Sequence, residues 1–292
     1  MYKGVMTALI TPFKKDGTVD YARFKKQIDY QIENGIGALV FLGTTGESAT
    51  LSHSEKIKII RFAVRYVAKR AMVIVGTGGN NTQVVRDFSR EAERLGADAL
   101  LVVTPYYNKC TQGGLIAHYT YIADSVHIPI ILYNVPGRTG VNILPETAKK
   151  LAQNPNIVGI KEASGNMGQI LEMLSFTTVD FAVYSGDDVL TLPVLSAGGS
   201  GVVSVASNIV PKEMKDICDK CFDGDIEGAR YKQNRLRPLI KSLFAEVNPI
   251  PIKCIMKIAQ MDSGVLRLPL TDASSDTEKM LVANYNDVIN QA

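Results

Sequence analysis

Cysteine is scarce in this sequence of 292 residues, which contains four. Four cysteines are too few to form a disulfide scaffold for a chain of this length. Cys218 and Cys221 have neither a second Cys-x-x-Cys pair nor a flanking histidine to complete a zinc site. We therefore predict no bound metal. We expect Cys110, Cys218, Cys221 and Cys254 to be reduced thiols of a cytoplasmic protein, and we assign no function to them.

An excess of charge and an export signal are also lacking. Lysine and arginine total 32 and aspartate and glutamate 29, which leaves a formal charge of +3. No basic stripe accompanies this balance, so we expect no nucleic-acid partner. The N-terminal residues 1–15 contain only a short apolar run, interrupted by Thr7, and no signal-peptide cleavage site. Nothing in this segment directs export.

One stretch without charge, residues 189–211, is long enough to raise the question of a membrane span. It contains Pro193, Gly198, Gly199 and Gly201, which divide it into a helix, a turn and a strand. We therefore expect a buried helix followed by a buried strand, and no membrane partner.

What the chain does contain is a regular series of short apolar segments. Hydrophobic residues make up 46% of the sequence and charged residues 21%, so a chain of this length can bury a large core. The segments lack the polar alternation of a half-exposed strand, which is typical of parallel strands covered on both faces. They are VMTALI from Val5, ALVFL from Ala38, MVIVG from Met72, ALLVV from Ala99, PIILY from Pro129, IVGIK from Ile157, FAVYS from Phe181 and GVVSV from Gly201.

The segments between these runs have helical periodicity. Asp20 can cap a helix that Gly35 ends, and Thr82 opens another. Ser52 and Glu55 form a capping box in front of a third. Strand and helix alternate eight times without a break, which predicts an α/β fold of the (β/α)8 type, a TIM barrel.

More residues follow the eighth run than one barrel helix needs. Two of the later segments, residues 226–244 and 250–261, are helix-like. We therefore predict a catalytic barrel over residues 1–224 and a small C-terminal α-helical appendage over residues 225–292.

Unusual polar residues gather where the predicted strands end. In a barrel of this kind the reactive residues lie at the C-terminal ends of the strands. The loops at the other ends are plain, so we predict the active site at the polar end. The polar segments are GTTGE at 43–47, GTGGN at 76–80, TPYYN at 104–108, YNVPGRTG at 133–140, KEASGN at 161–166 and SGDD at 185–188.

Lys161 is the most informative residue, because it ends the apolar run IVGI. An ammonium group that leaves water is costly unless it loses its proton or finds a partner. A lysine desolvated in this way is a usable nucleophile toward a carbonyl carbon. A lysine that reaches solvent at a strand end, or one paired with Glu162, is the alternative. Neighbouring strand residues point to opposite faces, which disfavours Glu162 as a partner.

Tyr133 ends the preceding strand as Lys161 ends its own, so the phenol and the amine can meet across neighbouring strands. A phenol within reach can carry the proton transfers of imine chemistry, although a tyrosine bonded to a core carbonyl is the alternative. The GTTGE turn suits a small carboxylate. Arg138 can bind a second carboxylate at the rim, and the alternative for it is a solvated surface arginine.

Six motifs run in order over essentially the whole chain: GTTGE at 43–47, TPYYNK at 104–109, YNVPGRTG at 133–140, IKEASGN at 160–166, YSGDD at 184–188 and NPIPIK at 248–253. Together they resemble those of the dihydrodipicolinate synthases, a family of class I pyruvate-dependent enzymes of aldolase type. The resemblance implies condensation of pyruvate with L-aspartate 4-semialdehyde to 4-hydroxy-tetrahydrodipicolinate, the first committed step of diaminopimelate and lysine synthesis. It implies no organic cofactor and no metal.

The resemblance also assigns the catalytic roles. Lys161 would form a Schiff base with pyruvate, and Tyr133 would donate and accept protons. Thr44 and Tyr107 would complete a relay to solvent, with Tyr107 supplied by a neighbouring subunit. The family therefore implies a homo-oligomer, usually a tetramer built as a dimer of dimers.

Substrate contacts follow from the same resemblance. Thr45, Gly186 and Val203 would line the pyruvate site, with Thr45 on the carboxylate. Arg138 would hold the carboxylate of the aldehyde. The rival activities, those of N-acetylneuraminate lyase and the 2-keto-3-deoxy sugar acid aldolases, share the lysine and the tyrosine, but Arg138 favours a substrate with a carboxylate. A non-catalytic keto-acid sensor is disfavoured, because it would be expected to have lost Lys161 or Tyr133.

The resemblance also points to a possible feedback site. In lysine-sensitive relatives, L-lysine binds at a dimer interface. Those relatives carry a glutamate where this chain has Val84, and commonly a histidine where it has Lys56. We therefore expect weak or absent inhibition by L-lysine. The positions that match the effector site are Ser48, Ala49, His53, Lys56, Asn80, Val84 and Tyr106.

Overall fold

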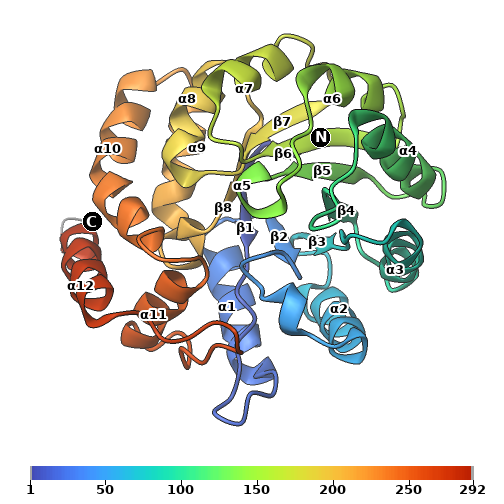
Figure 1. Ribbon diagram of the computed structural model, residues 1–292. Coiled ribbons are helices and arrows are strands. Elements are labelled where there is room, and N and C mark those ends of the chain that lie inside the picture. Colours follow the sequence, from blue (N-terminus) through green and yellow to red (C-terminus); the bar gives the residue numbers. More distant parts are fainter. Residues whose placement is uncertain (1, 291–292) are drawn as a thin grey trace.

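Eight parallel strands close into a barrel in the order of the sequence, so that β8 pairs with β1 (Figure 1). The computed structural model describes residues 2–290. Each of the eight predicted runs overlaps a strand, and the predicted TIM barrel is confirmed. The strands are β1 (Gly4–Ala8), β2 (Ala38–Phe41), β3 (Met72–Gly76), β4 (Ala99–Val103), β5 (Ile130–Asn134), β6 (Ile157–Glu162), β7 (Ala182–Ser185) and β8 (Gly201–Ser204).

Burial on both faces explains why the runs are continuously apolar. On β4, Ala99 and Leu101 belong to the cluster that fills the barrel, whereas Leu100 and Val102 belong to the cluster between the barrel and its helices. Alternate residues of a strand point to opposite faces. Since helices cover the outer face, neither face needs polar residues.

The helices form a ring around the barrel (Figure 1). The predicted starts are confirmed: the Asp20 side chain accepts hydrogen bonds from two backbone N–H groups of α1, and Ser52 and Glu55 form the capping box of α2. Asn81 caps α3 at Thr82. The helices are α1 (Tyr21–Glu33), α2 (His53–Val67), α3 (Thr82–Arg94), α4 (Gln112–Ala123), α5 (Pro136–Thr139), α6 (Pro145–Leu151), α7 (Met167–Leu174), α8 (Thr191–Ser196), α9 (Pro211–Phe222), α10 (Ile226–Leu243), α11 (Ile250–Ile258) and α12 (Ser275–Ile289), with the 3-10 helices η1 (Ser48–Thr50), η2 (Asp188–Leu190) and η3 (Ala206–Asn208).

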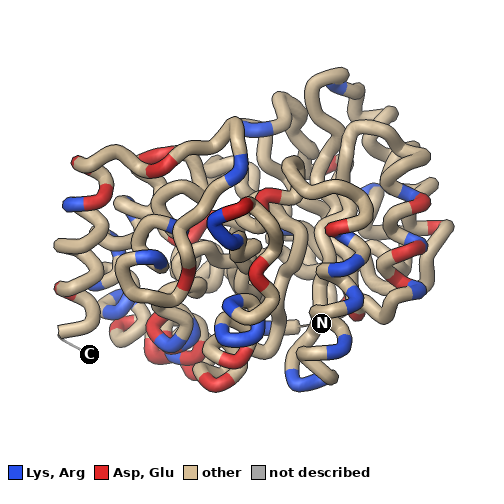
Figure 2. The backbone as a smooth tube through the Cα atoms, turned by 90° about the horizontal axis from the view of Figure 1, so that it is seen from below, with Lys and Arg blue, Asp and Glu red and all other residues tan. Residues whose placement is uncertain are grey.

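The uncharged stretch of residues 189–211 folds as expected, with the short helix α8 followed by the buried strand β8. Within residues 2–290, no helix has both the length and the apolar composition needed to cross a bilayer. Positive and negative residues are interspersed along the tube in Figure 2.

The C-terminal region adds three helices to the outer layer. Helix α10 packs along α9, and α12 packs against α10 and α11 (Figure 1). The sequence predicted α10 and α11 as helix-like segments, and it gave no specific expectation for α12. The division of the chain at residues 224 and 225 into two units stays a prediction.

Candidate active site

Lys161 and Tyr133 lie directly opposite each other on β6 and β5. The Nζ atom of Lys161 lies 4.1 Å from the centroid of the Tyr133 ring. Lys161 is 6% exposed, and Tyr133 belongs to the cluster inside the barrel. The amine and the phenol-bearing ring are therefore side by side, close to the C-terminal end of the barrel.

Glu162 is not the partner of Lys161, because its carboxylate is bound on the other side of β6. It accepts hydrogen bonds from Asn134 Nδ2 at 2.8 Å, from the Ser164 backbone N–H at 2.7 Å and from Gln169 Nε2 at 3.2 Å. Burial raises the pKa of Glu162, although these hydrogen bonds oppose the shift. The alternative in which Lys161 is neutralised by Glu162 is therefore wrong.

A cavity of about 320 Å3 opens at this end of the barrel. Its size suits a small-molecule ligand. Among its lining residues are Thr44, Tyr133, Arg138 and Asn248. The loops that follow β2, β3, β4 and β5 therefore meet the C-terminal region at a single cavity.

The GTTGE turn after β2 brings Thr44 to the cavity wall. Backbone hydrogen bonds from Gly46 N to Gly43 O, 3.1 Å, and from Glu47 N to Thr44 O, 3.0 Å, close the turn. Thr45 is buried, and its Oγ1 accepts a hydrogen bond of 2.9 Å from Asn248 Nδ2. The turn is thus tied directly to the C-terminal region.

Arg138 lies at the rim, on the short helix α5. Its side chain is exposed, and Nη2 donates a hydrogen bond of 3.1 Å to the backbone carbonyl of Asn248. Because Arg138 also lines the cavity, its guanidinium combines solvent access with a fixed position. Such a group can bind a carboxylate through paired hydrogen bonds.

Gly186 lies beside Lys161, and Val203 belongs to the cluster inside the barrel. The backbone N–H of Gly186 donates to the Glu162 carbonyl at 2.7 Å. A Cβ atom at Gly186 would lie 2.6 Å from the Ala163 Cβ and 3.1 Å from the Lys161 Cε, so a side chain does not fit there. Val203 is buried on β8 in the same interior cluster as Tyr133.

Tyr107 is the one predicted catalytic residue that stands apart from this group. Its side chain is 92% exposed and does not line the cavity. Its backbone has a φ of +70°, a left-handed conformation that is uncommon for a residue with a side chain. The preceding residue, Tyr106, does line the cavity.

The structure brings together only some of the seven predicted effector positions. Ser48, Ala49, Lys56 and Tyr106 line the same cavity, whereas His53, Asn80 and Val84 do not. His53 Nε2 lies 3.0 Å from Glu91 Oε2, and Val84 is 61% exposed. Burial lowers the pKa of Lys56.

Sequence reasoning missed three residues at this end of the barrel. Asn248 binds both Thr45 and Arg138. Glu47 and Lys253 form an ion pair in which both side chains are fully buried. All three lie within motifs that the sequence analysis singled out, GTTGE and NPIPIK, but no contact between those two motifs could be predicted from their spacing.

The structure offers little for a metal or for thiol chemistry. Within residues 2–290 there is no group of three or more His, Cys, Asp and Glu side chains that could hold a metal ion. All four cysteines, which lie within this range, are free. Burial raises the pKa of Cys218 to about 12, which makes its thiol unreactive.

Comparisons with known proteins point to one family. The profile of the Dihydrodipicolinate synthetase family matches residues 1–287. A 4-hydroxy-tetrahydrodipicolinate synthase of Alkaliphilus oremlandii is 49% identical over 282 residues, which cover 97% of each chain. The crystal structure of a dihydrodipicolinate synthase from Thermotoga maritima superimposes with a TM-score of 0.97 at 45% identity, over 100% of both chains. A lysine-bound enzyme of this name from Cyanidioschyzon merolae gives a TM-score of 0.95 at 43% identity, over 98% of both chains.

Proposed function

The chain belongs to the dihydrodipicolinate synthetase family, and from this premise we propose that it condenses pyruvate with L-aspartate 4-semialdehyde through a Schiff base on Lys161. The product is 4-hydroxy-tetrahydrodipicolinate, and the reaction belongs to diaminopimelate and lysine biosynthesis. The observation that carries the proposal is the position of the Lys161 amine, 4.1 Å from the Tyr133 ring centroid at the end of the barrel. Two relatives, 49% and 47% identical, carry the name of the synthase, which favours this reaction over those of the sugar acid aldolases and N-acetylneuraminate lyase.

The chemistry begins with the Lys161 amine. It adds to the keto carbon of pyruvate, and loss of water from the carbinolamine gives the imine. Removal of a methyl proton then gives the enamine, whose carbon attacks the aldehyde. Finally the amine of the second substrate attacks the imine carbon, which releases Lys161 and closes the ring. The protonated imine takes up an electron pair when the methyl proton leaves and again when the amine attacks its carbon, whereas the enamine supplies the electron pair that forms the bond to the aldehyde.

Tyr133 is the group best placed to move the protons. Its ring adjoins the Lys161 amine and it lines the cavity. A general acid and base must lie within hydrogen-bond reach of the reacting atoms, which this arrangement allows for a pyruvate bound at Lys161. In the same proposal, Thr44 and a Tyr107 from a neighbouring subunit pass the proton to solvent.

The two substrate carboxylates have separate partners in this proposal. Thr45, with Gly186 and Val203 nearby, binds the carboxylate of pyruvate. Arg138 binds that of the aldehyde at the rim. We further propose a cytoplasmic homo-oligomer, a tetramer built as a dimer of dimers.

Borohydride reduction tests the central step. We expect pyruvate and borohydride together to add one reduced pyruvyl group on Lys161 and on no other lysine, as located by peptide mass mapping. The buried Lys253 is an internal control, because its amine is committed to Glu47. A Lys161→Ala variant should form no adduct. An adduct on another lysine of the wild-type chain, or none at all, would contradict the mechanism.

A further inference from the structure

A second polar cluster lies behind the GTTGE turn, and no step of the proposed reaction uses it. At its centre are Glu47 and Lys253, which form an ion pair with both side chains 0% exposed. The Lys253 Nζ also donates a hydrogen bond of 2.8 Å to the Val265 carbonyl and lies 4.2 Å from the ring centroid of Phe13. Glu47 Oε2 accepts a hydrogen bond of 3.1 Å from the Arg267 backbone N–H.

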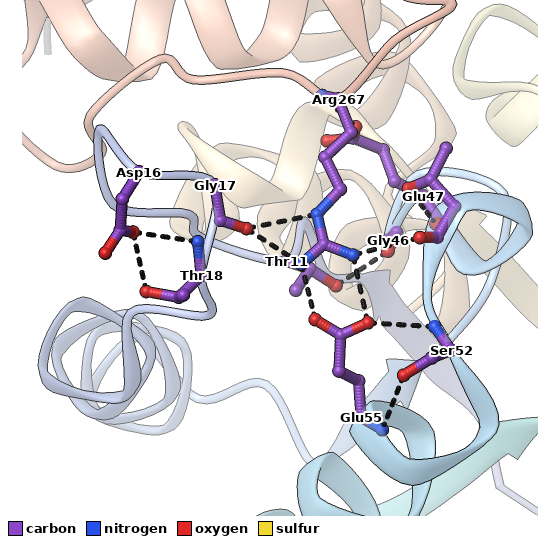
Figure 3. Close-up of polar contacts among 10 residues, drawn as sticks. Thr11, Asp16, Gly17, Thr18, Gly46, Glu47, Ser52, Glu55 and Arg267 are labelled. Atoms are coloured by element: carbon purple, nitrogen blue, oxygen red, sulfur yellow. Dashed lines mark hydrogen bonds and ion pairs between the residues drawn. The ribbon is translucent and has the colours of Figure 1, made fainter.

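Figure 3 shows how Arg267 joins this cluster to its surroundings. Its guanidinium binds the Glu55 carboxylate through two nitrogens, with Nη1 at 3.0 Å from Oε2 and Nη2 at 2.5 Å from Oε1. It also donates to the Gly17 carbonyl at 2.8 Å and to the Thr50 carbonyl at 2.9 Å. The segment around Arg267 is therefore bound to the N-terminal loop and to α2.

Stabilisation of the fold does not by itself explain a fully buried ion pair. Removing two charges from water costs free energy that their attraction often fails to exceed, so apolar residues frequently stabilise a core as well or better. Burial lowers the pKa of Lys253, which is the direction expected of a desolvated amine, and the Glu47 carboxylate opposes that shift. The pair therefore needs another explanation.

The backbone conformation at Glu47 indicates that a carboxylate side chain is specifically required at this position. Glu47 has a φ of +52°, a left-handed conformation that glycine adopts without cost. Leu42, on the other side of the turn, has a φ of +58°. Non-glycine residues in this region are strained and persist where their surroundings hold them. A glycine at position 47 would relieve the strain but would remove the partner of Lys253.

The pair lies close to the residues that bind pyruvate in the proposed function. Glu47 is two residues from Thr45 and three from Thr44 in the same turn. Lys253 lies on α11, in the segment that also contains Asn248, whose Nδ2 donates to Thr45 Oγ1 at 2.9 Å. The turn is thus joined to residues 248–253 at two points, one a neutral hydrogen bond and the other a buried ion pair.

We propose that the Glu47–Lys253 ion pair is a positioning device, which holds the GTTGE turn so that Thr44 and Thr45 face the pyruvate site. In this proposal both members act through the turn and not on the substrate: Glu47 lies in the cavity wall, but its side chain and that of Lys253 have no exposed surface. A buried pair suits this task because any displacement leaves two charges uncompensated in a region of low dielectric constant, which penalises movement more than a loss of apolar contact does. That the ligand is pyruvate rests on the proposed function, whereas the role of the ion pair in holding the turn does not.

The test uses the intact chain and three variants at this site: Glu47→Gln, Lys253→Met and the double variant. A matched control removes the ion pair between α9 and α10, Lys232 Nζ to Asp216 Oδ2 at 3.0 Å, through Asp216→Asn with Lys232→Met. Three quantities are measured: the temperature of unfolding, the pyruvate concentration for half-maximal borohydride trapping on Lys161, and hydrogen exchange at the amides of residues 43–47.

We expect each single variant to unfold at a lower temperature, because one charge stays buried without its partner. While folded, each should need on the order of tenfold to hundredfold more pyruvate for half-maximal trapping, since a displacement of about 1 Å can cost about a hundredfold. The double variant should regain thermal stability but not the affinity for pyruvate. The amides of Gly46 and Glu47 should exchange faster in all three variants, and the control should match wild type in pyruvate affinity and in exchange.

Wild-type pyruvate affinity and exchange in a folded variant at Glu47 or Lys253 would overturn the proposal, since the pair would then serve stability alone. If the single variants do not fold, the double variant decides the question by the same measurements. If the wild-type chain forms no pyruvate adduct, the proposed function fails, and amide exchange still decides whether the pair positions the turn.

Discussion

Lys161 and Lys253 are both almost completely buried, and what surrounds each amine separates their roles. Lys253 is paired with Glu47 and bonded to a backbone carbonyl. Lys161 has an aromatic ring beside it, and Glu162, its neighbour in sequence, is bound elsewhere. A lysine with a fixed carboxylate partner is a structural cation, whereas one beside a phenol is available for chemistry. Residue type and burial alone therefore do not identify the nucleophile.

At the scale of single residues, the prediction concerns Arg138. We expect Arg138→Ala to lower kcat/KM for the aldehyde by roughly tenfold to a hundredfold, because a hydrogen bond to a charged group contributes about 1.5–3 kcal/mol. Imine formation with pyruvate should change little, since in the proposed function the rim guanidinium binds only the second carboxylate. Steady-state kinetics and borohydride trapping measure the two effects.

The control for this prediction is Arg237→Ala, which removes an exposed arginine on α10. It should leave both measurements unchanged. Loss of pyruvate trapping in Arg138→Ala, with the aldehyde step intact, would reverse the assignment of the two carboxylates.

At the scale of the elements, the sequence predicted the strand ends well because their signals are local. The expected meeting of Lys161 and Tyr133 follows from counting residues to the ends of β6 and β5, and these two residues are paired in the sheet. The register between the two strands shifts at Ile130 and Ile131, near the other end. Such an irregularity cannot be foreseen from periodicity, but here it leaves the catalytic end in register.

The predicted effector positions lie on η1, α2 and α3 and in the loops that contain Asn80 and Tyr106. Of these positions, Lys56 is partly buried and lines the cavity, and Val84 is exposed on α3. A cationic ligand would meet a lysine and an apolar side chain where lysine-sensitive relatives offer a histidine and a glutamate. In the predicted effector site, a lysine at position 56 and a valine at position 84 therefore do not favour binding of L-lysine.

We therefore predict weak or absent inhibition by L-lysine. Loss of one charge-assisted hydrogen bond removes roughly 1.5–3 kcal/mol, which is about one to two powers of ten in affinity. Val84→Glu should strengthen inhibition, and Val179→Glu, at an 87% exposed valine elsewhere, should not. Activity assayed against rising lysine concentration decides the matter. Potent inhibition that Val84→Glu fails to strengthen would show that the site is wrongly assigned.

At the scale of the whole molecule, the contacts that the sequence did not predict share a cause. Asn248, Lys253 and Arg267 come from the C-terminal region, and their partners lie near the start of the chain. Periodicity and capping rules describe neighbours in sequence, so they give strands and helices but not contacts between distant segments. The barrel and its reactive end could thus be predicted, whereas the frame that holds the GTTGE turn could not.

The pH dependence of stability belongs to this scale. Burial raises the pKa of Asp188 to about 6, from 3.8, although its Oδ2 accepts hydrogen bonds from Val205 N and Ala206 N. Between these two values the folded chain keeps a proton that the unfolded chain releases. Asp188 therefore lowers the free energy of unfolding as the pH rises through this range, by about 3 kcal/mol in all.

Asp188→Asn should remove this decrease in the free energy of unfolding with rising pH. Relative to wild type, the variant should gain stability between about pH 4 and pH 6, up to about 3 kcal/mol, as measured by urea unfolding at a series of pH values. Asp223→Asn, at an exposed aspartate, should follow the wild-type profile. A constant difference between Asp188→Asn and wild type over this range would contradict the assignment.

Tyr107 carries the last prediction, which concerns assembly. Tyr107 is 92% exposed, its backbone has a left-handed φ of +70°, and it does not line the cavity that its neighbour Tyr106 lines. A catalytic tyrosine in this position is useful only if it enters the site of a second copy. We therefore predict a homo-oligomer in sedimentation, and a Tyr107→Phe variant with kcat lowered by about a hundredfold, as expected for loss of a proton-transfer group.

Subunit mixing tests whether the tyrosine acts between chains. Lys161→Ala and Tyr107→Phe chains should each have little activity. In a mixed pair, the site with an intact Lys161 receives an intact Tyr107 from the other chain. Random exchange makes half of the pairs mixed, each with one complete site, so activity should rise to about a quarter of wild type. If Tyr107 acts within its own chain, no mixed pair has a complete site, and activity after exchange would stay at the average of the two variants.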